Sequence, residues 1–172
     1  MPRVFFALWP DEPARAKLAA LAGRVADEGG GRPVPAANLH LTLAFLGDVP
    51  DDRVGVAKRV ASGIGGPAFE LALDRLGSFR RAGVSWAGPS CPPGALAHLQ
   101  SSLERALRSA GFALEERPFA PHLTLARKLV RPGAAAAIDP VAWDVEGFVL
   151  VESAREKGAY AQVAGWELGK GI

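Results

Sequence analysis

The sequence predicts a mixed protein in which short strands are interspersed with amphipathic helices. Its 172 residues are 49% hydrophobic and 22% charged, a composition typical of one globular domain. Short segments with alternating apolar residues indicate strands, and the segments between them, in which leucine and alanine recur every three or four residues, indicate helices. No low-complexity linker divides the chain, so we expect residues 1–172 to form a single domain.

The first half of the chain reads as strand, helix, strand, helix. Apolar runs at residues 4–9 and 38–46 predict strands, and Asp11 is expected to cap the helix between them. Gly29-Gly30-Gly31 should end that helix, because glycine readily adopts the left-handed conformation that closes a helix. Asp51-Asp52 are expected to cap the second helix.

The second half is predicted to contain a hairpin, one long helix and further strands. In order, the elements are a strand at 69–74, its hairpin partner at 84–87, a helix that follows Pro92-Pro93-Gly94, a strand at 119–127, a short helix or loop at 131–137, and closing strands at 142–151 and 160–168 around a turn at 156–158. Four leucines share the inward face of the helix: Leu96, Leu99, Leu103 and Leu107.

Composition excludes several classes of protein. The single cysteine, Cys91, excludes an internal disulfide framework and any multi-cysteine metal site. Apolar runs are far shorter than the ~20 residues that span a bilayer, and the first residues do not resemble a secretory signal. The formal charge of +2 is too small for a general nucleic-acid coat. We therefore expect a cytoplasmic monomer that does not bind membranes.

A pentapeptide occurs twice without change. His40-Leu41-Thr42-Leu43-Ala44 recurs as residues 122–126, and the two copies hold two of the three histidines in the chain. In a strand, residues i and i+2 point to the same face about 6.5–7 Å apart. Each copy therefore places its histidine and threonine on one face and its leucines on the core face. Two such strands side by side would bring two imidazoles and two hydroxyls together.

These residue types suit acid–base chemistry on a phosphate ester. Imidazole, with an unperturbed pKa of ~6.5, accepts and donates protons near neutral pH, and threonine hydroxyls bond the oxygens of a tetrahedral anion. Phosphodiester cleavage by this set requires no metal. The alternative is a repeated core strand whose polar groups are satisfied internally, but the sequence offers no obvious partners for them.

The two motifs, His40-Leu41-Thr42-Leu43 and its copy at 122–125, resemble those of the 2H phosphoesterase superfamily. The flanking segments at 3–8, 38–39, 45–47 and 118–121 look like those of the RNA 2′,3′-cyclic phosphodiesterases, also called 2′-5′ RNA ligases. The resemblance extends over nearly the whole chain.

The resemblance implies a bilobal α+β fold with two antiparallel sheets, outer helices and a pseudo-two-fold axis. The motifs are expected to face a central cleft. It implies that His40 is the proton donor, that His122 is the proton acceptor, and that Thr42 and Thr124 bind the phosphate. The implied reaction opens 2′,3′-cyclic phosphate ends of RNA to 2′-phosphates without a cofactor or metal, together with reversible 2′-5′ ligation.

Two further residues are candidates for substrate binding. Arg127 follows the second motif, where the family commonly carries an arginine, yet strand parity places it on the face opposite His122 unless a bulge intervenes. Phe45 offers a ring on which a base could stack, although most aromatic residues at such positions belong to the core. His98 lies off the leucine face of its helix and reads as a surface residue.

Two alternatives remain open on the sequence. One is a 2H phosphodiesterase for a small cyclic nucleotide or ADP-ribose cyclic phosphate. The other is a binder of RNA ends without catalytic activity, which would keep the same cleft. No phosphate-binding loop, His-Glu-x-x-His motif or Gly-x-Ser-x-Gly motif is present.

Overall fold

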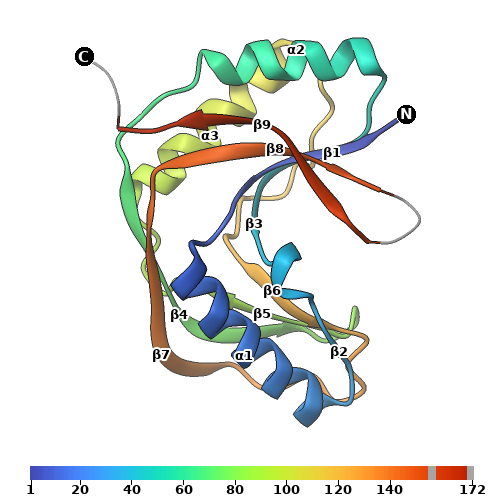
Figure 1. Ribbon diagram of the computed structural model, residues 1–172, viewed down its shortest axis with the longest axis vertical. Coiled ribbons are helices and arrows are strands. Elements are labelled where there is room, and N and C mark those ends of the chain that lie inside the picture. Colours follow the sequence, from blue (N-terminus) through green and yellow to red (C-terminus); the bar gives the residue numbers. More distant parts are fainter. Residues whose placement is uncertain (155–157, 170–172) are drawn as a thin grey trace.

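The computed structural model describes residues 1–154 and 158–169, arranged as one large antiparallel sheet flanked by helices (Figure 1). The elements, in chain order, are β1 (Arg3–Leu8), α1 (Glu12–Gly29), β2 (Arg32–Pro33), the short 3-10 helix η1 (Ala36–Asn38), β3 (Leu41–Asp48), α2 (Asp51–Ser62), β4 (Phe69–Phe79), β5 (Val84–Gly88), α3 (Gly94–Ser109), β6 (Leu123–Arg127), β7 (Ala136–Val145), β8 (Gly147–Ser153) and β9 (Tyr160–Glu167).

The strand order is symmetric about its centre. It runs β7-β4-β5-β6-β3-β1-β8-β9, with the short β2 paired to β6. The halves β6-β5-β4-β7 and β3-β1-β8-β9 meet at a single residue pair, Leu41 with Leu123. The α+β class and the antiparallel sheets are confirmed, and the two expected sheets are the halves of one continuous pairing path.

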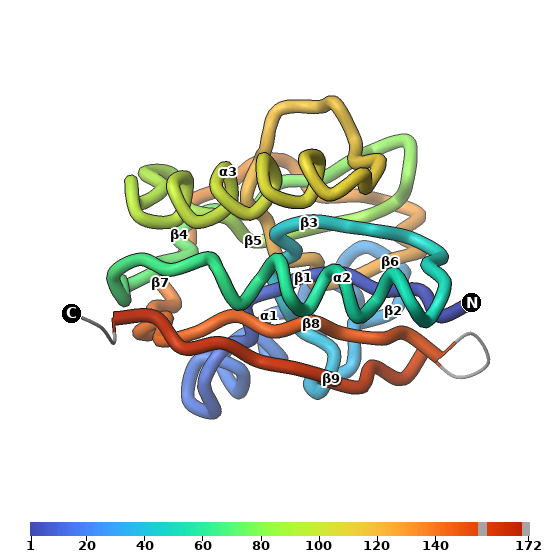
Figure 2. Tube along the Cα trace, turned by 90° about the horizontal axis from the view of Figure 1, so that it is seen from above, coloured from blue at the N-terminus to red at the C-terminus, as the bar shows by residue number. Residues whose placement is uncertain are grey.

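Helices α1 and α3 each pack against strands of the half other than that of the strand they follow in the chain. Helix α1 follows β1 in the chain but packs against β6 and β7 of the other half, and α3 follows β5 but packs against β3. Figure 1 shows α1 across the lower half of the molecule, and Figure 2 shows α2 and α3 running side by side above β8 and β9. One cluster of buried side chains contains residues from both halves.

Local signals explain the ends of the first helix and the inward face of the third. The Asp11 carboxylate accepts a 2.9 Å hydrogen bond from the Ala14 amide, as expected of a cap. Gly30 closes α1 in the left-handed region at φ 69°. All four predicted leucines of α3 are buried, and His98 is exposed.

Several expected elements are wrong in detail. Asp51 and Asp52 are the first helical residues of α2 and form no side-chain cap; they stabilise its N-terminus as charges in the first turn. Of the short helix or loop predicted at 131–137, residues 131–135 form the loop, whereas Ala136 and Ala137 already belong to β7 and pair with β4. Strand β4 runs five residues beyond the predicted end, because Arg75 and its neighbours alternate on a paired strand that is partly exposed.

The predicted strand at 142–151 is two strands. β7 pairs with β4 and β8 pairs with β1, so the chain passes from one half of the sheet to the other at Glu146. Buried positions change there from odd residues (Val141, Trp143, Val145) to even ones (Phe148, Leu150). This change of phase is a sequence signal of the break. The turn expected at 156–158 lies largely outside the described residues.

Within residues 1–154 and 158–169, no helix combines the length and hydropathy needed to cross a membrane.

Candidate active site

The two pentapeptides lie side by side at the centre of the sheet. Leu41 of β3 pairs with Leu123 of β6, the same position of each copy, in antiparallel orientation. In an antiparallel pair, the residue that precedes one partner lies opposite the residue that follows the other. His40 is therefore opposite Thr124, and Thr42 is opposite His122. Each histidine lies beside the threonine of the other motif.

The expected division of the two faces is confirmed. Four leucines of the motifs are 0–3% exposed in one apolar cluster: Leu41, Leu43, Leu123 and Leu125. The histidines and threonines are of intermediate exposure on the opposite face. These polar side chains reach a partly solvated surface, which argues against a repeated core strand whose polar groups are all satisfied internally.

Both strands carry a bulge at the fourth position of the pentapeptide. Ala7 and Phe6 of β1 pair with Thr42 and Ala44, leaving Leu43 extra. The same irregularity leaves Leu125 extra between the residues of β6 that pair with β5. A bulge shifts the alternation of side chains by one residue. Consequently the fifth residue after each histidine returns to the histidine face.

This shift decides the orientation of Phe45 and Arg127. Both are exposed, and Phe45 lines the same cavity as Thr42. The Arg127 charge is one of the causes that lower the pKa of His40, which places the guanidinium within electrostatic range of that ring. Of the two orientations left open for Arg127, the structure therefore favours the histidine face, because the bulge at Leu125 reverses the parity.

The carbonyls of the two bulge residues accept hydrogen bonds from different kinds of donor. The Leu43 carbonyl accepts a 3.3 Å hydrogen bond from the buried Gln100 side chain of α3. The Leu125 carbonyl accepts a 2.8 Å hydrogen bond from the Val34 amide, next to β2. An extra residue leaves a backbone group outside the ladder, and these contacts satisfy it. Sequence reasoning missed Gln100; a polar residue on the leucine side of an amphipathic helix is the signal that could have found it.

Both imidazoles are oriented in the same way. Nδ1 of His40 lies 2.6 Å from the Asn38 carbonyl oxygen, and Nδ1 of His122 lies 2.8 Å from the Ala120 carbonyl oxygen. A carbonyl oxygen only accepts, so Nδ1 of each ring carries the proton and donates it. Nε2 is then left to accept a proton when the ring is neutral and to donate one when the ring is charged.

Aromatic rings enclose His40. Phe5 and Trp9 of the β1 region stack on its ring with centroid distances of 4.8 and 5.0 Å, and Tyr160 of β9 meets it edge-on at 5.3 Å. The segment before the ring is held by a 2.7 Å hydrogen bond from the Asn38 side chain to the Gly158 carbonyl. Burial lowers the pKa of His40, the charges of Arg127 and His122 lower it further, and the Asn38 carbonyl opposes them.

His122 has a more open setting. Phe79 meets its ring edge-on at 5.2 Å, and Trp86 lies tilted at 6.2 Å. The Trp86 ring in turn receives the Arg75 guanidinium at 5.4 Å. Neither aromatic ring stacks on His122. Sequence reasoning named the histidines but missed Trp9 and Tyr160, because nothing in their local sequence shows that their strands flank His40.

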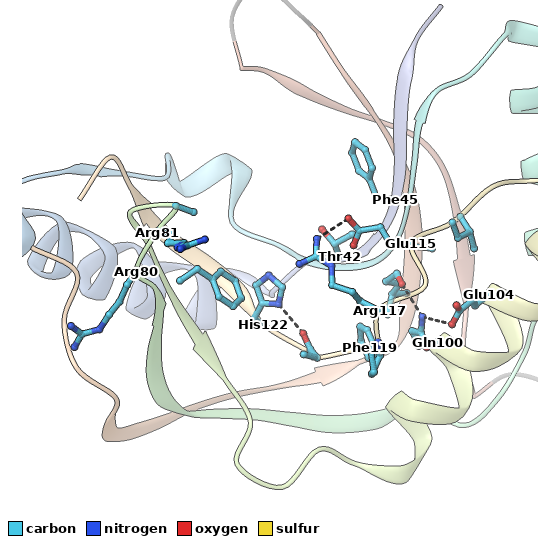
Figure 3. Close-up of a pocket in the computed structure, with 17 residues that line it drawn as sticks. Thr42, Phe45, Arg80, Arg81, Gln100, Glu104, Glu115, Arg117, Phe119 and His122 are labelled. Carbon is cyan, nitrogen blue, oxygen red and sulfur yellow. Dashed lines mark hydrogen bonds and ion pairs between the residues drawn. The ribbon is translucent and has the colours of Figure 1, made fainter. Parts of the chain in front are cut away.

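A cavity of about 810 Å³ opens beside His122. Its lining includes Thr42, Phe45 and His122 from the predicted site, and excludes His40, Thr124 and Arg127. Figure 3 shows His122 on one wall, with Arg117 reaching toward Thr42 and Phe45 above it. The cavity thus meets the paired motifs at one edge. In the part of the chain that the structure describes, no three His, Cys, Asp or Glu side chains gather as a metal site would require.

Comparison with known proteins agrees with this geometry. The family model of the 2′-5′ RNA ligase superfamily matches residues 9–157. The RNA 2′,3′-cyclic phosphodiesterase of Escherichia coli is 38% identical over 144 residues, which cover 80% of each chain. The chain belongs to the 2′-5′ RNA ligase superfamily. Superfamily membership identifies it as an enzyme that hydrolyses phosphodiester bonds, as expected from the two motifs.

Other superfamily members show the same similarity over the full fold. The RNA 2′,3′-cyclic phosphodiesterase of Thermus thermophilus is 34% identical over 166 residues, 88% of this chain and 81% of the relative. The crystal structure of E. coli LigT complexed with 3′-AMP superposes with a TM-score of 0.88 at 33% identity, covering 99% of this chain and 100% of that one.

Proposed function

We propose that this protein hydrolyses the 2′,3′-cyclic phosphate ends of RNA to 2′-phosphates by acid–base catalysis between two histidines. The observation that carries the proposal is the matched orientation of His40 and His122, each tied through Nδ1 to a backbone carbonyl. The names of the relatives support the substrate, and only a 2′-hydroxyl permits a 2′,3′-cyclic ester.

The reaction needs one neutral ring and one protonated ring. In the proposed assignment, neutral His122 takes a proton from water through Nε2, and the water oxygen attacks phosphorus. The bond from phosphorus to the 3′-oxygen breaks, and Nε2 of protonated His40 gives its proton to the departing oxygen. Each such transfer contributes typically 10²–10⁴ in rate. The product carries a 2′-phosphate and a free 3′-hydroxyl.

The threonines are proposed to hold the phosphate. The register places Thr42 beside His122 and Thr124 beside His40, so each hydroxyl can donate to a non-bridging oxygen while the neighbouring imidazole acts. The Arg127 charge favours an anion at the same place. These groups supply the stabilisation of developing negative charge that a metal provides in other phosphodiesterases.

The lowered pKa of His40 bears on the assignment of roles. A donor with a low pKa gives up its proton readily, but it is protonated in only a fraction of free molecules at neutral pH. A bound phosphate anion raises that fraction. Ligation follows from the same ring opening when a 5′-hydroxyl of RNA replaces water as the nucleophile: the new bond joins phosphorus to that oxygen, and the bond from phosphorus to the 3′-oxygen breaks.

The direct test is incubation with an oligoribonucleotide that ends in a 2′,3′-cyclic phosphate, with 2′- and 3′-phosphate products resolved. We expect 2′-phosphate, full activity in EDTA, and no activity in the double variant His40→Ala/His122→Ala. A mainly 3′-phosphate product would contradict the placement of donor and base. Activity lost in EDTA and restored by Zn²⁺ or Mn²⁺ would contradict the metal-free mechanism. Binding without turnover would favour the non-catalytic alternative.

A further inference from the structure

We propose that three polar side chains on one side of α3 position the two pentapeptides for catalysis. They are Gln100, Glu104 and Arg108, each four residues from the next, so that successive members are neighbours on the helix. We call these three residues the polar strip. The inference rests on the proposed function and goes beyond it, because it assigns a part in the reaction to side chains outside both motifs. The residues that the strip positions are Thr42 and His122.

At one end of the strip, Gln100 holds the bulge of β3. Its amide nitrogen donates to the Leu43 carbonyl at 3.3 Å and to the Glu104 carboxylate at 3.2 Å (Figure 3). Both partners only accept hydrogen bonds, so the amide nitrogen of Gln100, and not its amide oxygen, must face them. Leu43 is the extra residue that directly follows Thr42. The contact therefore restrains the backbone that carries the Thr42 hydroxyl.

At the other end of the strip, Arg108 holds the segment that leads into the second motif. Its guanidinium donates to the Glu104 carboxylate at 3.0 Å and to the carbonyls of Leu114 and Glu115 at 3.4 and 2.8 Å. In the described segment 112–122 there is neither helix nor strand. The Arg108 contacts thus restrain backbone groups that no ladder of secondary structure restrains.

This segment ends at the carbonyl that orients His122. The Ala120 carbonyl accepts the Nδ1–H of His122 at 2.8 Å, and Phe119 packs against the core just before it. Apolar packing is non-directional, whereas hydrogen bonds constrain direction, so the strip adds what Phe119 cannot supply. The strip therefore links the backbone of Thr42 to the backbone that orients His122, two residues that face each other across β3 and β6.

The simpler interpretation is that the strip only stabilises α3, since an ion pair at the spacing of Glu104 and Arg108 stabilises a helix whatever lies beside it. Two observations exceed that role. Gln100 is 8% exposed among the buried leucines of α3, where a polar group is costly unless its hydrogen bonds are needed. Arg108 reaches carbonyls that lie beyond the end of the helix. The matching bulge at Leu125 is bonded by a backbone amide, so only the first motif depends on a side chain here.

The experiment removes each end of the strip. Gln100→Met keeps the length of the side chain but not its donor, and Arg108→Met removes the guanidinium from an exposed position. On an oligoribonucleotide that ends in a 2′,3′-cyclic phosphate, we expect each variant to lower kcat roughly 10-fold, because small misplacements of reacting groups cost large factors in rate. Arg108→Lys should recover part of the loss. Arg105→Met, which removes the same charge from another exposed position of α3, should keep full kcat.

Two histidines separate positioning from stabilisation of the helix. His98 lies on α3 two residues before Gln100, whereas His122 lies beyond the far end of the strip. In Gln100→Met and Arg108→Met, the Cε1–H NMR signal of His122 should shift and that of His98 should stay in place, both signals being assigned through His98→Ala and His122→Ala. Should Gln100→Met fail to fold, the exposed Arg108→Met decides the question.

Three results would overturn the inference and leave the proposed function intact. The first is an unchanged kcat in both folded variants. The second is a fall in kcat without a shift at His122, and the third is a shift at both histidines together with a lower urea midpoint, which a merely structural role of the strip predicts. If the unmodified protein leaves the cyclic phosphate end unhydrolysed, the proposed function and the inference are both overturned.

Discussion

The surroundings of His40 and His122 differ although their motifs are identical. Each ring follows the same backbone course into a strand with the same bulge, and each donates Nδ1–H to the carbonyl two residues earlier. Around His40, two rings stack and a third closes the edge, whereas around His122 the aromatic contacts are edge-on or tilted. The motif therefore determines the backbone course and the Nδ1 hydrogen bond of each ring, and the neighbouring strands make the surroundings of the two rings unequal.

The same contrast extends along the two strands. The equivalent positions five residues after each histidine hold Phe45 and Arg127, and the bulge carbonyls are bonded by Gln100 and by the Val34 amide. One side thus offers an aromatic surface next to a large cavity, and the other a cation. An asymmetric substrate, with a nucleoside on one side of the phosphorus, fits such a site better than a symmetric one.

Removing either imidazole should have the largest effect. We expect His40→Ala and His122→Ala each to lower kcat by at least ~10², because each ring carries one proton transfer. His98→Ala, the exposed third histidine, serves as the matched control and should keep full activity. Turnover rates and far-ultraviolet circular dichroism on all three variants provide the check. Full activity in a folded His40→Ala or His122→Ala variant would remove the two-histidine model.

Removing one threonine hydroxyl should cost less. Thr42→Val and Thr124→Val keep the shape of the side chain and each delete one hydrogen bond of several to the phosphate. We expect a loss of roughly 10-fold in kcat/KM for each, which corresponds to one hydrogen bond to a charged group. A loss as large as that of the histidine variants would show that the threonines do more than bind.

Opening the enclosure of His40 should shift the pH dependence. We expect a bell-shaped profile of kcat/KM against pH. Its low-pH limb reports the lower of the two macroscopic pKa values of the histidine pair. Trp9→Leu admits water to one face of the ring, and burial is the largest cause of the lowered pKa, so this limb should move to higher pH. Phe79→Leu, at the other histidine, should leave the His40 titration in place.

The three histidines allow a direct reading by NMR. Their Cε1–H signals, assigned through the single variants, give the pKa of His40 in each protein, with His98 as an internal reference. A fall of the His40 pKa in Trp9→Leu would show that attraction between the charged imidazole and the indole face outweighs burial.

The buried ring should also make stability depend slightly on pH. The pKa of His40 is lowered from 6.5 in the folded protein, so below that value the unfolded chain binds more protons than the folded one. Stability is therefore complete above pH ~6.5 and declines as the pH falls toward the folded pKa. Urea unfolding at pH 7.5 and pH 5 should show a smaller difference for His40→Gln than for the unmodified protein. An equal or larger difference in the variant would contradict this account of the ring.

The sequence was sufficient to place the histidines and threonines of the motifs on one face, because a period of two residues determines which side chains share a face. The same rule failed at Arg127, where the bulge at Leu125 shifts the alternation; two adjacent apolar residues, Leu125 and Ala126, are its only local sign. The aromatic enclosure of His40 was beyond sequence reasoning for a different reason. Trp9 and Tyr160 meet the ring only because β1 lies between β3 and β8, and β8 pairs with β9. Such long-range order has no local pattern.

The inequality of the two histidines is tested most directly by a substrate whose leaving group needs no proton. We would compare a 2′,3′-cyclic phosphate end with a 2′-deoxyribonucleoside 3′-(4-nitrophenyl) phosphate in His40→Ala and His122→Ala. This ester has no 2′-hydroxyl, so water is the nucleophile, and its nitrophenolate departs unprotonated. The proposed roles require that His40→Ala regain most of its lost activity on the nitrophenyl ester and that His122→Ala remain impaired on both substrates. Recovery by His122→Ala instead would reverse donor and base, and equal impairment of both variants on both substrates would contradict the division of labour altogether.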